Sequence, residues 1–238
     1  MSVPPFRQGA NQRVPRILLV CTGNICRSPL AEQLLRARFE AIGLQAEVHS
    51  AGTHAMVASP MTEEAAALAL KHGAHSTQHA ARQLTEQLVG EADLILTATR
   101  DHRREVVTLL PKATRYTFTL NQFARLVSAP AEPAAQPSDS VPSPERGPMI
   151  EPGTGSLGWA QLAGAPAPAT GPPVSALSVF IASIAATRGL HPSPNPPTLD
   201  DIEDPYRQSA AVYTRVADIV DASVTTIAAA LAPALRHS

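Results

Sequence analysis

The sequence of 238 residues contains only two cysteines, Cys21 and Cys26, which stand five positions apart. A disulfide framework needs cysteines in separate segments. The pair therefore excludes a fold held together by cross-links between distant parts of the chain. With no such structural task, both thiols become candidates for chemistry.

Lysine is also scarce, with two residues against 17 arginines, and the formal net charge is only −1. The arginines form no cluster, so we expect neither a nucleic-acid partner nor a polybasic membrane anchor. No apolar run reaches the roughly 18 residues that a membrane span needs, and the polar start of the chain lacks a signal-peptide core. We expect a cytoplasmic protein without a membrane partner.

One apolar segment leads into a loop with unusual chemistry. Residues 17–20 predict a buried strand that carries Cys21 to the carboxyl edge of a sheet, where open α/β folds place their sites. Arg27 offers a planar fork of donors that can bind two phosphate oxygens. Gly23 lets the intervening backbone curl so that its amides face an anion. The pattern predicts a phosphate-binding loop (P-loop) of the Cys-x5-Arg type.

A helix is predicted to begin directly after this loop. Ser28 and Pro29 are typical of an N-cap and a first helical residue, so the positive end of a helix dipole would lie at the same place. Such surroundings lower the pKa of a cysteine thiol, and the thiolate is the form that attacks. Cys21 is therefore the predicted nucleophile.

The sequence Val-Cys-Thr-Gly-Asn-Ile-Cys-Arg-Ser-Pro-Leu-Ala-Glu at 20–32 resembles the signature of the low-molecular-weight protein tyrosine phosphatases. The resemblance covers residues 16–127 and 199–232. It implies hydrolysis of a phosphomonoester through a phosphocysteine intermediate. No metal or cofactor is expected, because arginine and backbone amides supply the positive charge. The residues expected to bind the phosphate are Thr22, Gly23, Asn24, Ile25, Cys26 and Ser28.

The same resemblance assigns a general acid in the second half of the chain. Asp204 precedes Pro205 and Tyr206, and this Asp-Pro-Tyr order is similar to the acid loop of the family. A neutral carboxylic acid beside the leaving oxygen accelerates such a step by about 10²–10⁴-fold. Tyr206 is expected to flank the cleft. The remaining carboxylates of this run are expected to be solvated neighbours, namely Asp200, Asp201 and Glu203.

Three more positions enter through the resemblance. Ser50 opens the phrase Ser-Ala-Gly-Thr that recurs in the family, and it is expected to support the loop. Met56 stands where the family usually has an aromatic residue on the cleft wall, and methionine can still contact a ring through its sulfur. His79 matches a histidine that braces the phosphate loop. We expect it to support the loop rather than transfer protons, and an ordinary structural histidine is the alternative.

Cys26 leaves two interpretations open. By resemblance, it could form a reversible disulfide with Cys21 that protects the nucleophile from irreversible oxidation. Alternatively, it is a small buried residue that only fills space.

Strand and helix patterns alternate along the first half of the chain. Strands are predicted at 17–20, 46–50, 92–97 and 115–120, and helices at 28–42, 59–72, 99–110 and 212–231. Ser59 and Thr99 are the expected caps of the second and third helices. The alternation predicts an α/β protein with a four-stranded parallel sheet and helices on both faces. The resemblance implies a Rossmann-like three-layer fold of the phosphotyrosine phosphatase I type.

Composition changes sharply in the middle of the chain, where 15 of the 23 prolines fall between residues 130 and 197. We predict a phosphatase domain at 16–232, preceded by a flexible tail at 1–15 and interrupted by a largely disordered Pro/Ala-rich insertion at 128–198. Apolar residues at helical spacing predict a short helix near 175–188. We interpret the prolines as a tolerated insertion; a ligand for aromatic-groove domains is the alternative.

Three other functions remain as alternatives. An arsenate reductase of this fold would need further cysteines downstream, and none follows Cys26. A protein arginine phosphatase tends to carry threonine where Ile25 stands, so the apolar side chain favours phosphotyrosine. A phosphate-binding regulatory module without turnover would not need Cys21, Arg27 and Asp204 together. The resemblance implies a phosphotyrosine-containing protein as substrate, and a bacterial-type tyrosine kinase is the candidate partner.

Overall fold

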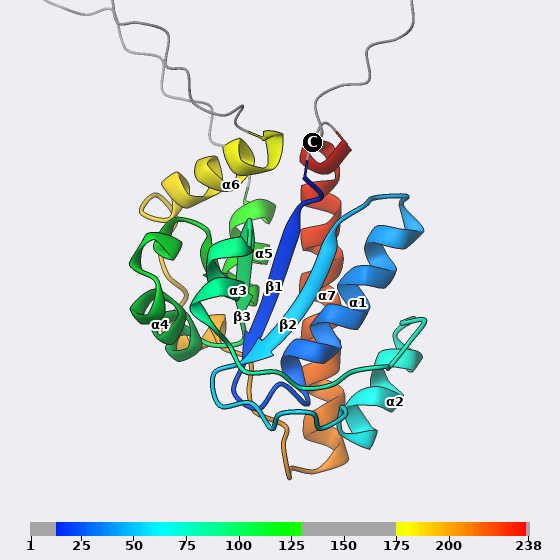
Figure 1. The fold of residues 1–238 in the computed structure, drawn as a ribbon. Helices are drawn as coiled ribbons and strands as arrows, with labels where there is room; N and C mark the ends of the chain where they lie inside the picture. Colours follow the sequence, from blue (N-terminus) through cyan, green and yellow to red (C-terminus); the bar gives the residue numbers. More distant parts are fainter. Residues whose placement is uncertain (1–12, 130–174, 237–238) are drawn as a thin grey trace, which may run out of the picture. The chain divides into compact units, whose positions relative to one another are not determined.

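The structure is a computed structural model that describes residues 13–129 and 175–236. Four strands form one parallel sheet in the order β2-β1-β3-β4 (Figure 1). The strands are β1 (Arg16–Cys21), β2 (Glu47–Gly52), β3 (Leu94–Thr97) and β4 (Thr117–Thr119). This confirms the predicted parallel sheet. The last strand is shorter than predicted because Thr119 already caps the next helix.

Seven helices occur among the described residues, with two short 3₁₀ turns. They are α1 (Arg27–Ala41), α2 (Glu63–Lys71), α3 (Glu86–Glu91), α4 (Arg100–Leu109), η1 (Pro111–Arg115), α5 (Leu120–Ser128), α6 (Ala176–Thr187), η2 (Pro197–Asp200) and α7 (Ala210–Arg236). Helices α3 and α5 were not predicted, because each is short and carries only one or two turns of apolar pattern.

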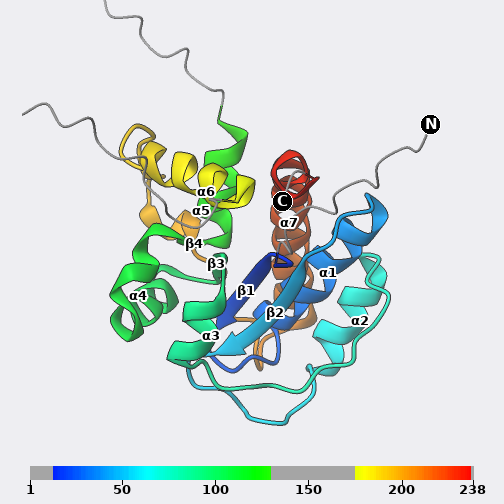
Figure 2. The same cartoon turned by 45° about the horizontal axis from the view of Figure 1, so that its top comes forward.

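The helices cover both faces of the sheet, as predicted. Ile17 and Leu19 of β1 face a core shared with α1, α5 and α7, whereas Leu18 and Val20 face a smaller core with α3 and α4. Side chains alternate in this way because successive strand residues point to opposite faces. In both views α1 and α7 lie side by side behind β1 and β2, and α4 lies on the side of β3 (Figures 1 and 2).

Two predicted helix caps need correction. Helix α2 begins at Glu63, and its cap is Thr62, whose hydroxyl accepts a hydrogen bond from the Ala65 amide. Ser59 is therefore outside the helix. Helix α1 begins at Arg27, so Ser28 lies inside its first turn rather than at the cap. Its hydroxyl is thereby available for contacts with the loop.

Helix α7 is the one described helix that is long and apolar enough to cross a membrane by length and composition. Its most apolar 18-residue window has a mean hydropathy of 1.4, and 44% of that window is buried inside the protein. A core helix passes the same test, and Val220 and Ile227 of α7 are fully buried in the core. The sequence contains no uninterrupted apolar run of this length, because Asp218 and Asp221 interrupt the apolar residues of α7.

Parts of the predicted domain organisation lie outside the described residues, including most of the tail at 1–15 and most of the insertion at 128–198. The described end of the insertion forms α6, where a short helix is predicted, and Leu177 and Ile181 are buried there. Beyond it, the Arg188 guanidinium lies 3.7 Å from the centre of the Phe118 ring. Near the start of the described chain, Arg13 forms an ion pair with Asp93.

Candidate active site

The loop between β1 and α1 carries the predicted nucleophile. Cys21 ends β1 and is 2% exposed, and its sulfur lies 2.9 Å from the Ser28 hydroxyl. When Cys21 is a thiolate, Ser28 can only be the donor in this contact. The start of α1 places Ser28 there, seven residues after the end of the strand.

Asn24 holds the loop in shape. It is fully buried and adopts a φ of 57°, a left-handed conformation that asparagine tolerates better than most residues. Its side-chain amide donates to the hydroxyls of Ser28 and Ser50, at 2.9 and 2.8 Å. The His79 ring nitrogen Nε2 donates to the backbone carbonyl of Asn24 at 2.6 Å. The structure thus brings Ser50 and His79 to the back of the loop, where the sequence predicts them.

Gly23 does not adopt the special backbone conformation that was expected to let the loop curl. Its φ is not positive, and a Cβ at this position would meet Ile25 at an ordinary 3.5 Å. The left-handed residue is its neighbour Asn24. Close approach matters instead at Gly52 of β2, where a Cβ would lie 2.3 Å from the Thr22 carbonyl oxygen. Only glycine allows the strand to pass so near the loop.

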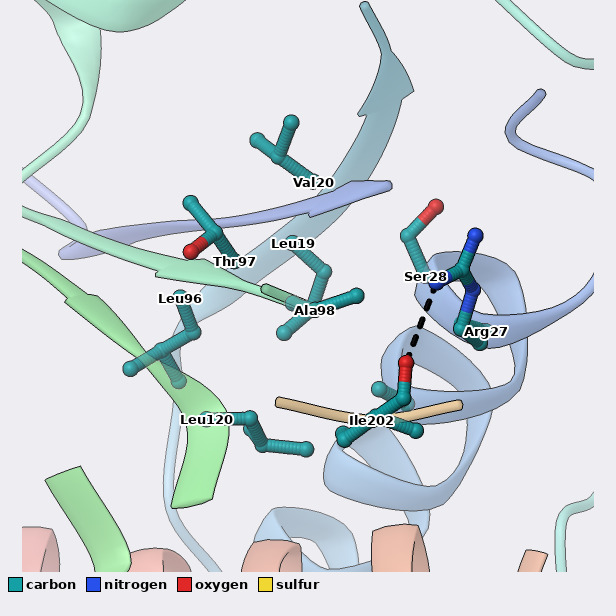
Figure 3. Close-up of a pocket in the computed structure, with 10 residues that line it drawn as sticks. Leu19, Val20, Arg27, Ser28, Leu96, Thr97, Ala98, Leu120 and Ile202 are labelled. Atoms are coloured by element: carbon teal, nitrogen blue, oxygen red, sulfur yellow. Dashed lines mark hydrogen bonds between the residues drawn. The ribbon is translucent and has the colours of Figure 1, made fainter. Parts of the chain in front are cut away.

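Arg27 supplies the positive charge of the loop. Its side chain is 6% exposed, and Nη1 donates to the Ile202 carbonyl at 3.1 Å (Figure 3). Nη2 contacts Asp204 at 2.8 Å and the Thr22 hydroxyl at 3.4 Å, whereas Nε has no hydrogen-bond partner among the described residues. A buried donor without a partner costs about 1–3 kcal/mol. Nε and Nη2 form one edge of the guanidinium, which can bind two oxygens of an anion.

Beneath the loop, the body of Arg27 rests on apolar packing. Leu19, Leu96, Leu120 and Ile202 surround a cavity of about 10 Å³ beside it (Figure 3). This is about the volume of one water molecule. The surrounding side chains restrict the guanidinium to one position, so it is preorganised for an anion.

Asp204 lies across the cleft from the loop. Its side chain is 53% exposed, its Oδ2 contacts Arg27, and its Oδ1 accepts a hydrogen bond from the Tyr206 amide at 3.2 Å. The cleft between the two loops has a volume of about 190 Å³. Its lining residues are Cys21, Thr22, Gly23, Ile25, Cys26, Arg27, His54, Met56, Asp204 and Tyr206.

Sequence reasoning missed one wall residue, His54. Residues 53–56 run along the loop between β1 and α1, with the His54 amide donating to the Thr22 carbonyl at 3.0 Å and the Met56 amide to the Gly23 carbonyl at 3.0 Å. This pairing brings both side chains to the cleft. No signal at His54 could have shown this, because the pairing depends on tertiary structure.

Two of the presumed solvated carboxylates are structural. Asp200 is 6% exposed and pairs with Arg125 of α5 at 2.9 Å. Asp201 accepts from the Arg100 backbone amide at 2.7 Å and from its guanidinium at 2.9 Å. The expectation was wrong because both arginines lie far away in the sequence. Of the three neighbours, Glu203 alone is exposed, as expected, and it pairs with Arg215 of α7.

His102 is a second residue that the sequence did not reveal. It lies in the first turn of α4 and is 6% exposed, with Nε2 2.8 Å from the Thr22 hydroxyl and Nδ1 2.7 Å from the Thr99 hydroxyl. Burial, followed by the charge of Arg27, lowers the pKa of His102 to about 4. The imidazole is therefore neutral at pH 7. The predicted cap at Thr99 was a usable signal, since it places residue 102 in the first turn.

Cys26 remains a buried thiol behind the nucleophile. Its sulfur lies 3.6 Å from both the Thr62 hydroxyl and the Tyr213 hydroxyl of α7, and neither cysteine is in a disulfide. Burial raises the pKa of the Cys26 thiol, and it raises the pKa of Tyr213 to about 12. Both interpretations of Cys26 stay open. Within residues 13–129 and 175–236, no group of three or more His, Cys, Asp or Glu side chains could hold a metal ion.

The parallel sheet, the Cys-x5-Arg loop and the facing carboxylate define an α/β protein with an oxyanion site built around a cysteine. The sequence profile of the low molecular weight phosphotyrosine protein phosphatases matches residues 16–135. The chain belongs to this family, as its signature predicts.

Relatives of two named activities are similar to this chain. Low molecular weight protein-tyrosine-phosphatase Etp of Escherichia coli (strain K12) is 40% identical over 107 residues, which cover 45% of this chain and 70% of Etp. The protein-arginine-phosphatase of Bacillus subtilis (strain 168) is 39% identical over 108 residues, which cover 45% of this chain and 71% of that protein.

Solved structures agree on the fold. A YwlE mutant from Bacillus subtilis superposes with a TM-score of 0.57 at 22% identity, covering 92% of this chain and 99% of the other. The Erwinia amylovora tyrosine phosphatase AmsI gives 0.54 at 21% identity, covering 92% and 94%. At such identities the likeness shows the fold alone.

Proposed function

We propose that this chain is a protein-tyrosine phosphatase that works through a phosphocysteine intermediate. The observation that carries the proposal is the buried edge of Arg27, where Nε has no partner among the described residues and Nη2 contacts an exposed, movable carboxylate. This edge shares one cleft with Cys21. A phosphoryl group bound there would place phosphorus next to the sulfur.

In the first step, two oxygens of the phosphomonoester bind the Arg27 edge, and Asp204 leaves Nη2. The displaced carboxyl acts in this step in its protonated form. The Cys21 thiolate attacks phosphorus, an S–P bond forms, and the P–O bond to the leaving group breaks. Asp204 gives its proton to the leaving oxygen, so no free alkoxide or phenoxide is formed.

In the second step, water hydrolyses the phosphocysteine. Asp204, now a carboxylate, takes a proton from the attacking water, and the S–P bond breaks. Inorganic phosphate and the Cys21 thiolate are the products. The Ser28 hydroxyl, 2.9 Å from the sulfur, stabilises the thiolate as it leaves.

The walls of the cleft favour an aromatic leaving group. Ile25, Met56 and Tyr206 line a space into which a phenyl ring fits beside the phosphate loop. We therefore place a cytoplasmic phosphotyrosine-containing protein as the substrate and the bacterial-type tyrosine kinase that makes it as a partner. Kinship with bacterial enzymes named protein-tyrosine-phosphatase supports this choice.

A phosphoarginine substrate is the second candidate. The 39% identity with the protein-arginine-phosphatase of Bacillus subtilis favours it. Ile25 argues against it, because the resemblance to arginine phosphatases predicts threonine at this position.

The proposal is tested by Cys21→Ser. We expect this variant to lose turnover of para-nitrophenyl phosphate and to keep its affinity for inorganic phosphate, since the Arg27 edge and the loop amides remain. Acid quenching of the wild type during turnover should trap a phosphoryl group on the peptide that contains Cys21. Near-normal turnover by the serine variant would overturn the proposal.

A further inference from the structure

The first turn of α4, residues 99–102, contacts both loops of the cleft. His102 lies against Thr22 of the phosphate loop, 2.8 Å from its hydroxyl. Arg100, two residues earlier, holds Asp201 of the acid loop through its backbone amide and its guanidinium. These two loops are 175 residues apart between Arg27 and Ile202. One short turn therefore links segments that the sequence keeps far apart.

Building on the proposed function, we propose that this turn positions the two loops relative to each other. His102 fixes Thr22 and, through it, Arg27. Arg100 fixes Asp201 and, through it, Asp204. Both are positioning residues, because neither lines the cleft.

The contacts of His102 leave the imidazole no freedom. Its two ring nitrogens bind the hydroxyls of Thr22 and Thr99, and the side chain is buried. The Thr22 hydroxyl also accepts from Arg27 Nη2 at 3.4 Å. A chain of hydrogen bonds thus runs from Thr99, the N-cap of α4, to the guanidinium that is to hold the phosphate. Because the chain is buried, removing its central member leaves unpaired polar groups at both sides.

The contacts of Arg100 hold the acid loop just before Asp204. Its Nε lies 3.2 Å from Asp201 Oδ1 and its Nη2 2.9 Å from Oδ2, a fork-like pairing that fixes direction as well as distance. The next residue, Ile202, donates its amide to the Ala98 carbonyl at 2.8 Å and accepts from Arg27 through its own carbonyl. Movement of the acid is thereby confined to the residues after 202.

The two halves of the turn should give different kinetic signatures. Loss of His102 loosens Arg27, which binds phosphate in every substrate. The value of kcat/KM should therefore fall by the same factor for all leaving groups, and the affinity for inorganic phosphate should fall with it. Loss of Arg100 misplaces only the acid, so poor leaving groups should suffer most. A general loss of folding would not separate the two.

The Arg100 arm uses Arg100→Gln, Asp201→Asn and the double variant. We expect kcat/KM for phenyl phosphate to fall about tenfold in each, with para-nitrophenyl phosphate much less affected and the inhibition constant of inorganic phosphate unchanged. The double variant should be no worse than either single one, because both remove the same contact. An equal loss for both substrates, or additive losses, would overturn this half.

The matched control for this arm is Arg104→Gln on the same helix. Arg104 forms an exposed ion pair with Asp101 and touches neither loop. It should behave as the wild type.

The His102 arm uses His102→Ala, His102→Gln and Thr22→Val. We expect inorganic phosphate to bind about tenfold more weakly to His102→Ala, with kcat/KM lower for all aryl phosphates by a similar factor. Glutamine should restore part of the loss, because its amide can still bond to Thr22. Thr22→Val should show the same loss, and adding His102→Ala should not deepen it. Unchanged phosphate affinity in Thr22→Val or His102→Ala, or additive effects, would overturn this half.

Two readouts separate this proposal from the proposed function. Phosphate affinity and amide hydrogen exchange of residues 22–27 and 201–206 do not require turnover. If the wild type bound phosphate without hydrolysing aryl phosphates, the proposed function would fail, and these readouts would still decide the role of the turn. We expect faster exchange at 201–206 in Arg100→Gln and at 22–27 in His102→Ala; unchanged exchange would contradict it.

Discussion

Arg27 and Asp204 form an ion pair in which Nη2 and Oδ2 are 2.8 Å apart. The arginine side chain is 6% exposed and the aspartate 53% exposed, so the two partners differ in their freedom to move. The cation is fixed by its surroundings, whereas the carboxylate can swing away into solvent. An exposed carboxylate in such a pair contributes little to stability, about 0–1 kcal/mol. It is therefore readily displaced by a phosphate dianion.

Replacing Asp204 tests this competition. Asp204→Asn should lower kcat for phenyl phosphate by about 10²–10⁴-fold, since the acid is lost. It should also bind inorganic phosphate a few-fold more tightly, because no carboxylate competes for Nη2. Steady-state kinetics and phosphate inhibition measure both effects. Glu203→Gln, next to it in an exposed pair with Arg215, is the control. Weaker phosphate binding in Asp204→Asn would contradict the idea.

The buried pair between Asp200 and Arg125 should matter for stability. Arg125→Ala would leave Asp200, which is 6% exposed, without its partner, and we expect a loss of about 3 kcal/mol in the free energy of unfolding. Urea denaturation measures this loss. Arg104→Ala, which removes an exposed pair, should change the same quantity by less than about 0.5 kcal/mol. Similar values for both variants would show that Asp200 is solvated after all.

His102 should make the fold sensitive to acid. Its pKa is lowered from 6.5 to about 4 by burial and by Arg27. Between these values the unfolded chain binds a proton that the folded chain does not, so stability falls as the pH drops from about 6.5 to about 4. The full effect is on the order of 3 kcal/mol.

The measurement is the free energy of unfolding against pH for the wild type and His102→Gln. Carboxylates titrate in both proteins, so the difference between the two curves isolates the imidazole. Parallel curves over this range would show that His102 is not buried as a neutral group.

Oxidation with peroxide distinguishes the two possible roles of Cys26. If Cys26 forms a disulfide with Cys21, the wild type treated with peroxide should regain its activity when a thiol reductant is added. The Cys26→Ala variant should lose its activity irreversibly. Burial raises the pKa of Cys26, so this thiol forms the disulfide slowly. The fraction of activity that is recovered should therefore increase as the pH rises. Equal recovery of both proteins would leave Cys26 as a residue that only fills space.

Ile25 should bias the choice of substrate. Ile25→Thr removes apolar surface from the cleft wall and adds a hydroxyl, which should reduce kcat/KM for phosphotyrosine peptides relative to phosphoarginine peptides. A change of about tenfold in the ratio is expected. An unchanged ratio would place specificity elsewhere.

The sequence predicts those parts of the site that are contiguous in the chain. Residues 20–32 carry the strand, the loop and the helix start together, and the order Asp204, Pro205, Tyr206 marks the acid. The sheet follows from apolar strands that alternate with helices, each with its own local signals.

The parts that could not be predicted depend on distant partners. Asp201 looks like a solvated carboxylate until Arg100, 101 residues upstream, is seen beside it. His102 gains its role from Thr22, 80 residues away. The left-handed loop residue is Asn24 rather than Gly23. Asn24 donates two hydrogen bonds and accepts two, and these stabilise a conformation that glycine would adopt without help.

The ion pairs of Asp200 and Asp201 make the position of the acid loop independent of the length of the chain before it. Asp200 and Asp201, which lie after residue 174, form ion pairs with Arg125 of α5 and Arg100 of α4. The chain is therefore fixed again before it reaches Asp204, the proposed acid. A change in the number of residues between 129 and 175 would therefore leave the position of the proposed acid unchanged.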